Sequence, residues 1–81
     1  MKTFKDLKPG DVVYDSTGSG IWRNTIIKII INKYSVEFVT RDNTDNTFIF
    51  SVSNSSINSN TYLDVWHVYT TDLKQIITYL N

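Results

Sequence analysis

The sequence contains no cysteine and no alanine, and among its 81 residues it has one histidine, one proline and three glycines. Without cysteine, neither a disulfide scaffold nor a thiolate metal site can form. A chain of this length is expected to form one domain, residues 1–81, that depends on its hydrophobic core alone. Hydrophobic residues make up 41% of the chain and aromatic residues 14%, which is enough to fill a small core.

Long hydrophobic runs are also missing. The isoleucine run 29–31 is far shorter than the roughly 18 residues that a membrane span requires. The charged N-terminal residues 1–6 are not followed by the apolar stretch of a signal peptide. We therefore expect a cytoplasmic protein without a membrane partner.

No excess of one charge is present, because eight Lys and Arg balance eight Asp and Glu. The distribution is nevertheless uneven: residues 1–41 carry seven positive and four negative charges, and residues 42–81 carry one positive and four negative charges. Nucleic-acid-binding domains usually have a clear basic excess. The sequence therefore predicts that any nucleic-acid binding is weak and confined to the basic half.

The residues needed for catalysis or metal binding are scarce. His67 is the only histidine, the chain has a single glutamate, and no Gly-x-Ser-x-Gly nucleophile motif occurs. Metal sites need clustered ligands, and covalent catalysis needs a nucleophile beside a base. We expect no enzymatic activity, no cofactor and no metal, and we interpret His67 as a packed or edge-lying side chain.

Short β-branched and aromatic segments, separated by turn-forming residues, predict a mainly β fold with five strands. In the long second segment the isoleucines do not keep one parity, which predicts either a β-bulge near Lys28 or a strand that bends from one sheet to another. The last segment would place Tyr62 and Tyr69 on opposite faces. The predicted strands cover residues 12–15, 21–33, 34–41, 47–52 and 62–69.

Two further segments flank the final strand. Residues 53–60 contain seven Ser or Asn and one isoleucine, Ile57, which predicts a mobile loop with little to anchor it. After Thr71, a good N-cap, apolar residues recur at helical spacing and predict a helix over about 72–80 that packs on the barrel. The apolar stripe consists of Leu73, Ile76, Ile77 and Leu80.

The segment Leu7-Lys8-Pro9-Gly10-Asp11-Val12-Val13-Tyr14 resembles the opening of SH3-like and KOW-like barrels, where a Gly-Asp turn leads into the first strand. The run Ile26-Ile27-Lys28-Ile29 is similar to the strand that follows. The ending Val68-Tyr69-Thr70-Thr71-Asp72-Leu73 is similar to small uncharacterised bacteriophage proteins. The resemblance implies a five-stranded SH3-like barrel with a C-terminal helix. A KOW domain normally continues with a basic, glycine-rich second half, whereas here that half is acidic.

Two groups of side chains are candidates for binding. Aromatic and cationic residues of the basic half, with Trp22 and Arg23 at the start of the long strand, suit single-stranded nucleic acid, although ordinary core and surface roles also explain them. A second aromatic pair lies near the end of the chain, either beneath the helix, which we favour, or exposed to a partner. The candidate residues are Trp22, Arg23, Lys28, Lys33, Arg41, Tyr62 and Trp66.

These observations predict a non-catalytic binding or accessory module encoded by a phage or mobile element. Its expected partner is a protein, such as a host factor that it inhibits in the host cytoplasm, bound through aromatic and strand-edge surface. Two alternatives remain open: a weak KOW-like nucleic-acid-binding module, and a small structural subunit that self-associates through a strand edge.

Overall fold

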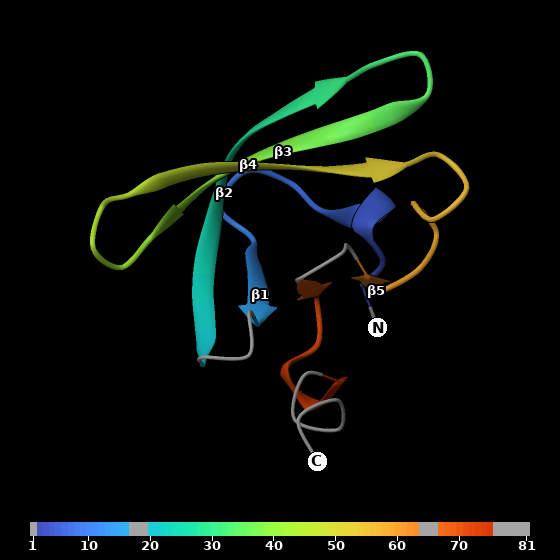
Figure 1. Ribbon diagram of the computed structural model, residues 1–81. Helices are drawn as coiled ribbons and strands as arrows, with labels where there is room; N and C mark the ends of the chain where they lie inside the picture. Colours follow the sequence, from blue (N-terminus) through green and yellow to red (C-terminus); the bar gives the residue numbers. More distant parts are fainter. Residues whose placement is uncertain (1, 17–19, 64–66, 76–81) are drawn as a thin grey trace.

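Six strands and one turn of 3-10 helix account for most of the residues that the computed structural model describes, which are 2–16, 20–63 and 67–75 (Figure 1). The 3-10 helix η1 covers Phe4–Asp6. The strands are β1 (Val12–Ser16), β2 (Ile21–Ile31), β3 (Ser35–Asp42), β4 (Thr47–Ser53), β5 (Thr61–Leu63) and β6 (Val68–Thr70).

All six strands belong to one antiparallel sheet in the order β4-β3-β2-β1-β6-β5. The sheet curls into a half-barrel, so the mainly β prediction is confirmed (Figure 1). The first four predicted strands match β1 to β4 closely. The long β2, β3 and β4 run side by side, while β1, β6 and β5 continue the sheet on the other side of β2.

The prediction of a single fifth strand over 62–69 is wrong. Its two ends form separate strands, β5 and β6, that pair antiparallel with Tyr62 opposite Tyr69. Directly opposed residues lie on the same face of a sheet, so these two tyrosines share a face instead of lying on opposite ones. The intervening sequence has one turn-forming residue, Asp64, and no glycine, proline or asparagine, so it indicates a reversal only weakly.

The predicted bulge in β2 is confirmed. Ile26 pairs with Thr40 and Lys28 pairs with Val39, so the register shifts between them and Ile27 is the extra residue. The bulge explains the mixed parity of the isoleucines: Ile26 faces the core before it, and Ile29 packs against the core after it. A bulge also bends the strand, which helps the sheet to curl.

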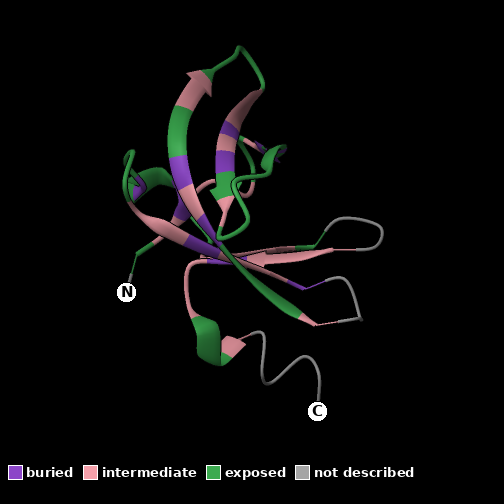
Figure 2. Cartoon of the chain, turned by 90° about the vertical axis from the view of Figure 1, so that its left-hand side faces the viewer, coloured by how far each residue is buried: buried purple, intermediate pink, exposed green. Residues whose placement is uncertain are grey.

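The core lies on the inner face of the curled sheet and is closed at one end by η1. Phe4 from η1 contacts Phe38 and Phe50, with ring centroids 6.2 and 6.4 Å away, respectively. Burial is greatest where the strands cross, whereas the tip of the β2–β3 hairpin, at the top of Figure 2, is exposed. The buried hydrophobic residues are Phe4, Leu7, Val13, Ile26, Phe38, Phe50 and Val52.

The polar loop after β4 is better anchored than its composition predicts. The amides of Phe4 and Lys5 donate hydrogen bonds of 2.9 Å to the carbonyls of Ser59 and Ile57, so η1 lies beside this loop (Figure 1). Asn54 also donates from its amide to the carbonyl of Tyr34. The loop was expected to be mobile, with only the Ile57 side chain able to pin it to the core, but backbone hydrogen bonds from distant segments hold it as well.

At the C-terminal end, residues 73–75 are helical, and the rest of the predicted helix, 76–80, lies outside the described residues. Asp72, and not the predicted Thr71, occupies the N-cap position, because the helical residues begin at Leu73 and Oδ1 of Asp72 accepts a hydrogen bond from the Lys74 amide. The Thr71 hydroxyl donates instead to the carbonyl of Lys2, and the Thr71 amide donates to the carbonyl of Asn60. Leu73 is 39% exposed. In the part of the chain that the structure describes, no helix is long and apolar enough to cross a membrane.

Candidate functional site

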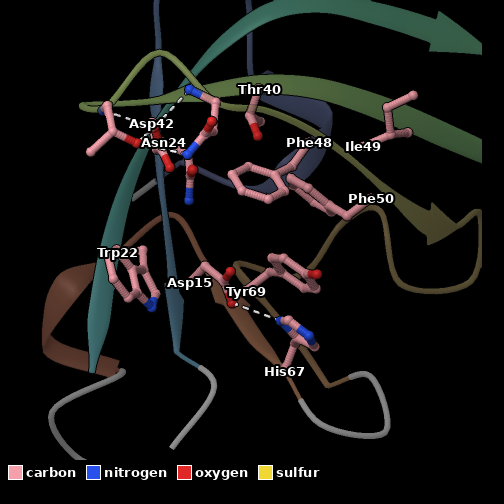
Figure 3. Close-up of a pocket in the computed structure, with 12 residues that line it drawn as sticks. Asp15, Trp22, Asn24, Thr40, Asp42, Phe48, Ile49, Phe50, His67 and Tyr69 are labelled. Carbon is pink, nitrogen blue, oxygen red and sulfur yellow. Dashed lines mark hydrogen bonds and ion pairs between the residues drawn. The ribbon is translucent and has the colours of Figure 1, made fainter. Parts of the chain in front are cut away.

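A cavity of about 600 Å³ opens on the inner face of the half-barrel, beside the core (Figure 3). This volume lies within the range usual for ligand pockets. Five strands, the turn after β3 and the residue before β6 contribute side chains. The lining residues are Asp15, Trp22, Asn24, Thr40, Asp42, Thr44, Asn46, Phe48, Ile49, Phe50, His67 and Tyr69.

Strand pairing explains why residues from distant parts of the sequence meet here. Asp15 of β1 lies opposite Trp22 on β2 and opposite Tyr69 on β6. On the far side of β2, Thr40 lies opposite Phe48. Because directly opposed residues share a face, these pairings bring β1, β2, β6, β3 and β4 into one lining.

Parallel rings form one wall of the cavity. Tyr69 stacks on Phe50 with centroids 4.3 Å apart and planes inclined by 7°, and on His67 with centroids 5.5 Å apart and planes inclined by 3°. Phe50 stacks in turn on the buried Phe38 at 5.2 Å. The stack connects the wall to the core and so holds Tyr69 and His67 in place.

An aspartate–histidine pair lies at the end of this wall. Nδ1 of His67 donates to Oδ1 of Asp15 over 3.1 Å, and the side chains are 36% and 17% exposed, respectively (Figure 3). Burial raises the pKa of the Asp15 carboxyl above its usual range, and the hydrogen bond and charge of His67 oppose that rise. Asp15 is therefore a poorly solvated carboxyl group with a single charge-bearing neighbour among the described residues.

Asp42, the second carboxylate of the cavity lining, is held by hydrogen bonds within its own turn. Oδ1 of Asp42 accepts hydrogen bonds from the Thr44 amide, the Thr44 hydroxyl and the Asn46 amide, at 2.8, 2.7 and 3.0 Å. These bonds, of which the one from the Thr44 hydroxyl has the largest effect, hold the pKa of the half-exposed Asp42 carboxyl below its usual range. Asp42 therefore fixes the β3–β4 turn as an ionised group.

The open side of the cavity is aromatic. Trp22 is 45% exposed and Phe48 is 53% exposed, although both rings project toward the same cavity as the buried Phe50 (Figure 3). Large aromatic surfaces next to a core are usually buried, so their exposure marks contact area that a partner can cover. No Lys or Arg is among the lining residues. Within the described ranges, no group of three or more potential metal ligands occurs.

The structure separates the residues of the predicted basic site. Trp22 lines the cavity, whereas its neighbour Arg23 lies on the outer face by strand alternation. Arg41 pairs with Thr25 and Lys28 pairs with Val39, so both cations share that outer face with Arg23. Lys33 lies at the hairpin tip, with its ammonium group 5.3 Å from the centre of the Tyr34 ring.

The second predicted pair is also divided. Tyr62 is half-buried and packs against the core cluster. Trp66, its expected companion, lies outside the described residues.

Sequence reasoning missed most of the cavity, which includes Asp15, Phe48, Phe50, His67 and Tyr69 as functional candidates. One signal could have found the central pair. Asp15 and Trp22 are equally distant from the midpoint of the polar loop 17–20, so a symmetric hairpin places them opposite each other. No local signal indicates that β6 joins β1, and His67 and Tyr69 enter the site only through that pairing.

No protein-family model matches the chain, and the comparisons found no similar curated protein and no similar solved structure.

Proposed function

We propose that this protein is a non-catalytic binding module that holds a segment of a partner protein in the cavity on its inner face. The observation that carries the proposal is the exposure of Trp22 and Phe48 at the mouth of an otherwise well-packed aromatic wall. Tryptophan and other large aromatics provide much contact area with few rotatable bonds, and they dominate the binding energy of many protein interfaces.

The arrangement around His67 supports a binding role over a catalytic one. Its Nδ1 bonds to Asp15, but among the described residues no serine or threonine hydroxyl bonds to the ring. A nucleophile activated by histidine needs such contact, although it tightens in some enzymes only when substrate binds. The Asp15–His67 pair instead forms the polar edge of the aromatic contact surface in the cavity.

The wider setting of the proposal comes from the sequence. An SH3-like barrel, a phage or mobile-element origin, and inhibition of a host factor in the host cytoplasm rest on the resemblance of the strand opening and the C-terminal segment. The half-barrel with its aromatic inner face suits such a role, because it offers one concave surface of the size that a short peptide segment fills.

The test is selection of binders from a random dodecapeptide library, followed by measurement of Kd for wild type and variants. Trp22→Ala should weaken the selected peptides at least tenfold, the usual effect at an interface hot spot. Tyr34→Ala is the matched control, because Tyr34 is an aromatic residue, 74% exposed, at the hairpin tip and outside the cavity. Peptides that bind Trp22→Ala as tightly as wild type, or the absence of any selected peptide, would contradict the proposal.

A second candidate function, weak nucleic-acid binding, is favoured by one observation. Arg23, Lys28 and Arg41 are all exposed on the outer face of β2 and β3, without Lys33. Three phosphate contacts would make the logarithm of the association constant fall with log salt concentration with a slope of about −2 to −3, since each contact contributes roughly −0.7 to −0.9. Oligonucleotide titrations at two salt concentrations, with Arg23→Gln and Arg41→Gln together as the variant, decide this candidate. Absence of binding at low salt would remove it.

A further inference from the structure

The cavity contains a carboxylate and an exposed aromatic ring placed as direct neighbours. Asp15 and Trp22 are paired across β1 and β2, and both line the cavity. Residues opposed in this way have Cβ atoms about 4.5–5.5 Å apart, so their side chains border the same space. Figure 3 shows the Asp15 and Trp22 side chains on neighbouring strands, with the hydrogen bond between Asp15 and His67.

The charge of the lining has one sign. Two aspartates contribute to it, and none of the lining residues is Lys or Arg. Asp42 Oδ1 is engaged by three hydrogen bonds of its own turn. Asp15, by contrast, has one hydrogen bond among those of the described residues, from His67, so its second oxygen can accept from a ligand.

This environment discriminates between kinds of ligand. An anionic group would meet two carboxylates, and a neutral apolar group would leave Asp15 poorly solvated and without a full counter-charge. A cation suits both side chains, because it pairs with the Asp15 carboxylate and is attracted to the face of the Trp22 ring. The aromatic wall lowers the local dielectric, which strengthens both contacts.

Among cationic side chains, arginine fits best. Its guanidinium group is planar, so it can stack on Trp22 while its N–H groups donate to Asp15 in the plane. It is also more weakly hydrated than an ammonium group, which matters because the Asp15 side chain is only 17% exposed. A cavity of about 600 Å³ has room for this side chain and for parts of its neighbours.

We infer that the cavity recognises an arginine side chain of the partner protein, held between the Asp15 carboxylate and the Trp22 ring. This inference rests on the proposed function, since it names the chemistry of the segment that the module binds. Phe48 and the Tyr69 wall then contact the residues that flank the arginine.

The experiment uses the peptides selected on the full-length protein. Arginine should be enriched in them, and replacing the critical arginine by citrulline, its neutral analogue, should weaken binding about tenfold or more, as expected for a charge-assisted hydrogen bond. Asp15→Asn should cause a similar loss with the arginine peptide. It should cause almost none with the citrulline peptide, because the two changes remove the same interaction. Lysine in place of arginine should bind more tightly than citrulline and more weakly than arginine.

The outcomes separate this inference from the proposed function. Peptides that depend on Trp22 but lack an enriched cation, or that bind Asp15→Asn as tightly as wild type, would overturn the arginine pocket while leaving peptide binding intact. Peptides that do not depend on Trp22 would overturn both. Asp15→Asn preserves the size of the side chain and one oxygen that can accept from His67, so the amide spectrum of the variant should match that of wild type away from the cavity.

Discussion

At the residue scale, Asp15 combines a cost to folding with a use in binding. Its carboxyl group is mostly buried between two strands and an aromatic wall, with His67 as a half-exposed partner. Charged groups at protein surfaces are usually placed where water solvates them. A residue kept in a poorly solvated position, next to an exposed tryptophan, indicates that a ligand completes its environment.

The raised pKa of Asp15 predicts a gain in stability on substitution. A carboxyl group whose folded pKa exceeds its unfolded value of 3.8 adds stability that is complete below pH 3.8 and is lost as the pH rises through the folded pKa. At pH 7 the ionised group therefore opposes folding. Asp15→Asn, which can still accept from His67, should raise the free energy of unfolding at pH 7 by about 1 kcal/mol or less.

The pH dependence supplies the control for that measurement. In denaturant titrations, the difference between Asp15→Asn and wild type should disappear as the pH falls below 3.8, where Asp15 is protonated in both folded and unfolded states. A variant less stable than wild type at pH 7 would show that the ionised pair with His67 stabilises the fold.

At the element scale, the short β5–β6 hairpin depends on one buried hydroxyl group. Thr70 is fully buried, and its hydroxyl donates to the carbonyl of Asn60 over 2.9 Å, accepts from the amide of Asp72 and contacts the hydroxyl of Thr61. Two strands of three residues cannot form a stable hairpin by themselves. This network joins both ends of the hairpin to the segments that flank it.

Replacement of Thr70 by valine keeps the shape of the side chain and removes the hydroxyl group. The partly buried carbonyl of Asn60 and amide of Asp72 then each lose a hydrogen bond, so Thr70→Val should lower the free energy of unfolding by about 1–3 kcal/mol. Thr25→Val is the control, because Thr25 is half-exposed on β2 and should change stability by about 0.5 kcal/mol or less. Equal effects of the two substitutions in chemical denaturation would argue against the network.

The loop after β4 offers a second prediction at this scale. The amides of Phe4 and Lys5 donate to the carbonyls of Ser59 and Ile57, so they should exchange slowly with solvent. Asn58 is exposed and its amide has no hydrogen-bond partner among the described residues, so it should exchange quickly. Fast exchange at all three amides in NMR measurements would restore the view of an unanchored loop.

At the scale of the whole molecule, the half-barrel leaves sheet edges, and β4 is one of them. Its sequence, Thr-Phe-Ile-Phe-Ser-Val-Ser, has no charged residue and no proline. Edge strands are normally protected by such residues, because their free backbone groups pair readily with another strand. Ile49 on this strand is 62% exposed, which adds an apolar side chain to the unprotected edge.

An unprotected edge predicts reversible self-association at high protein concentration. Ile49→Lys should reduce it, since a lysine on each copy would repel its counterpart across a β4–β4 contact. The control is Ile31→Lys, because Ile31 is 82% exposed but lies at the end of β2, an interior strand. Sedimentation equilibrium should show weaker association for the first variant alone. An equal decrease for both would indicate a general effect of charge.

The sequence alone determined the features that depend on neighbouring residues. Alternation and turn chemistry located β1 to β4, and the changing parity of the isoleucines indicated a bulge near Lys28, because side-chain direction along a strand follows from backbone geometry. The structure has the extra residue at Ile27. The absence of cysteine excluded disulfides and thiolate metal sites directly from the sequence, and the single histidine argued against a histidine-based metal site.

Only the tertiary structure decided which distant segments meet. The reversal between β5 and β6 carries no glycine or proline, and the pairing of β6 with β1 joins residues more than fifty positions apart, such as Asp15 and Tyr69. Such contacts form because together they bury apolar surface and pair backbone groups. Their combined stabilisation depends on distant segments of the chain, so no local sequence pattern predicts it. The cavity, with Asp15 and Trp22 beside His67 and Tyr69, exists only as a result of that pairing.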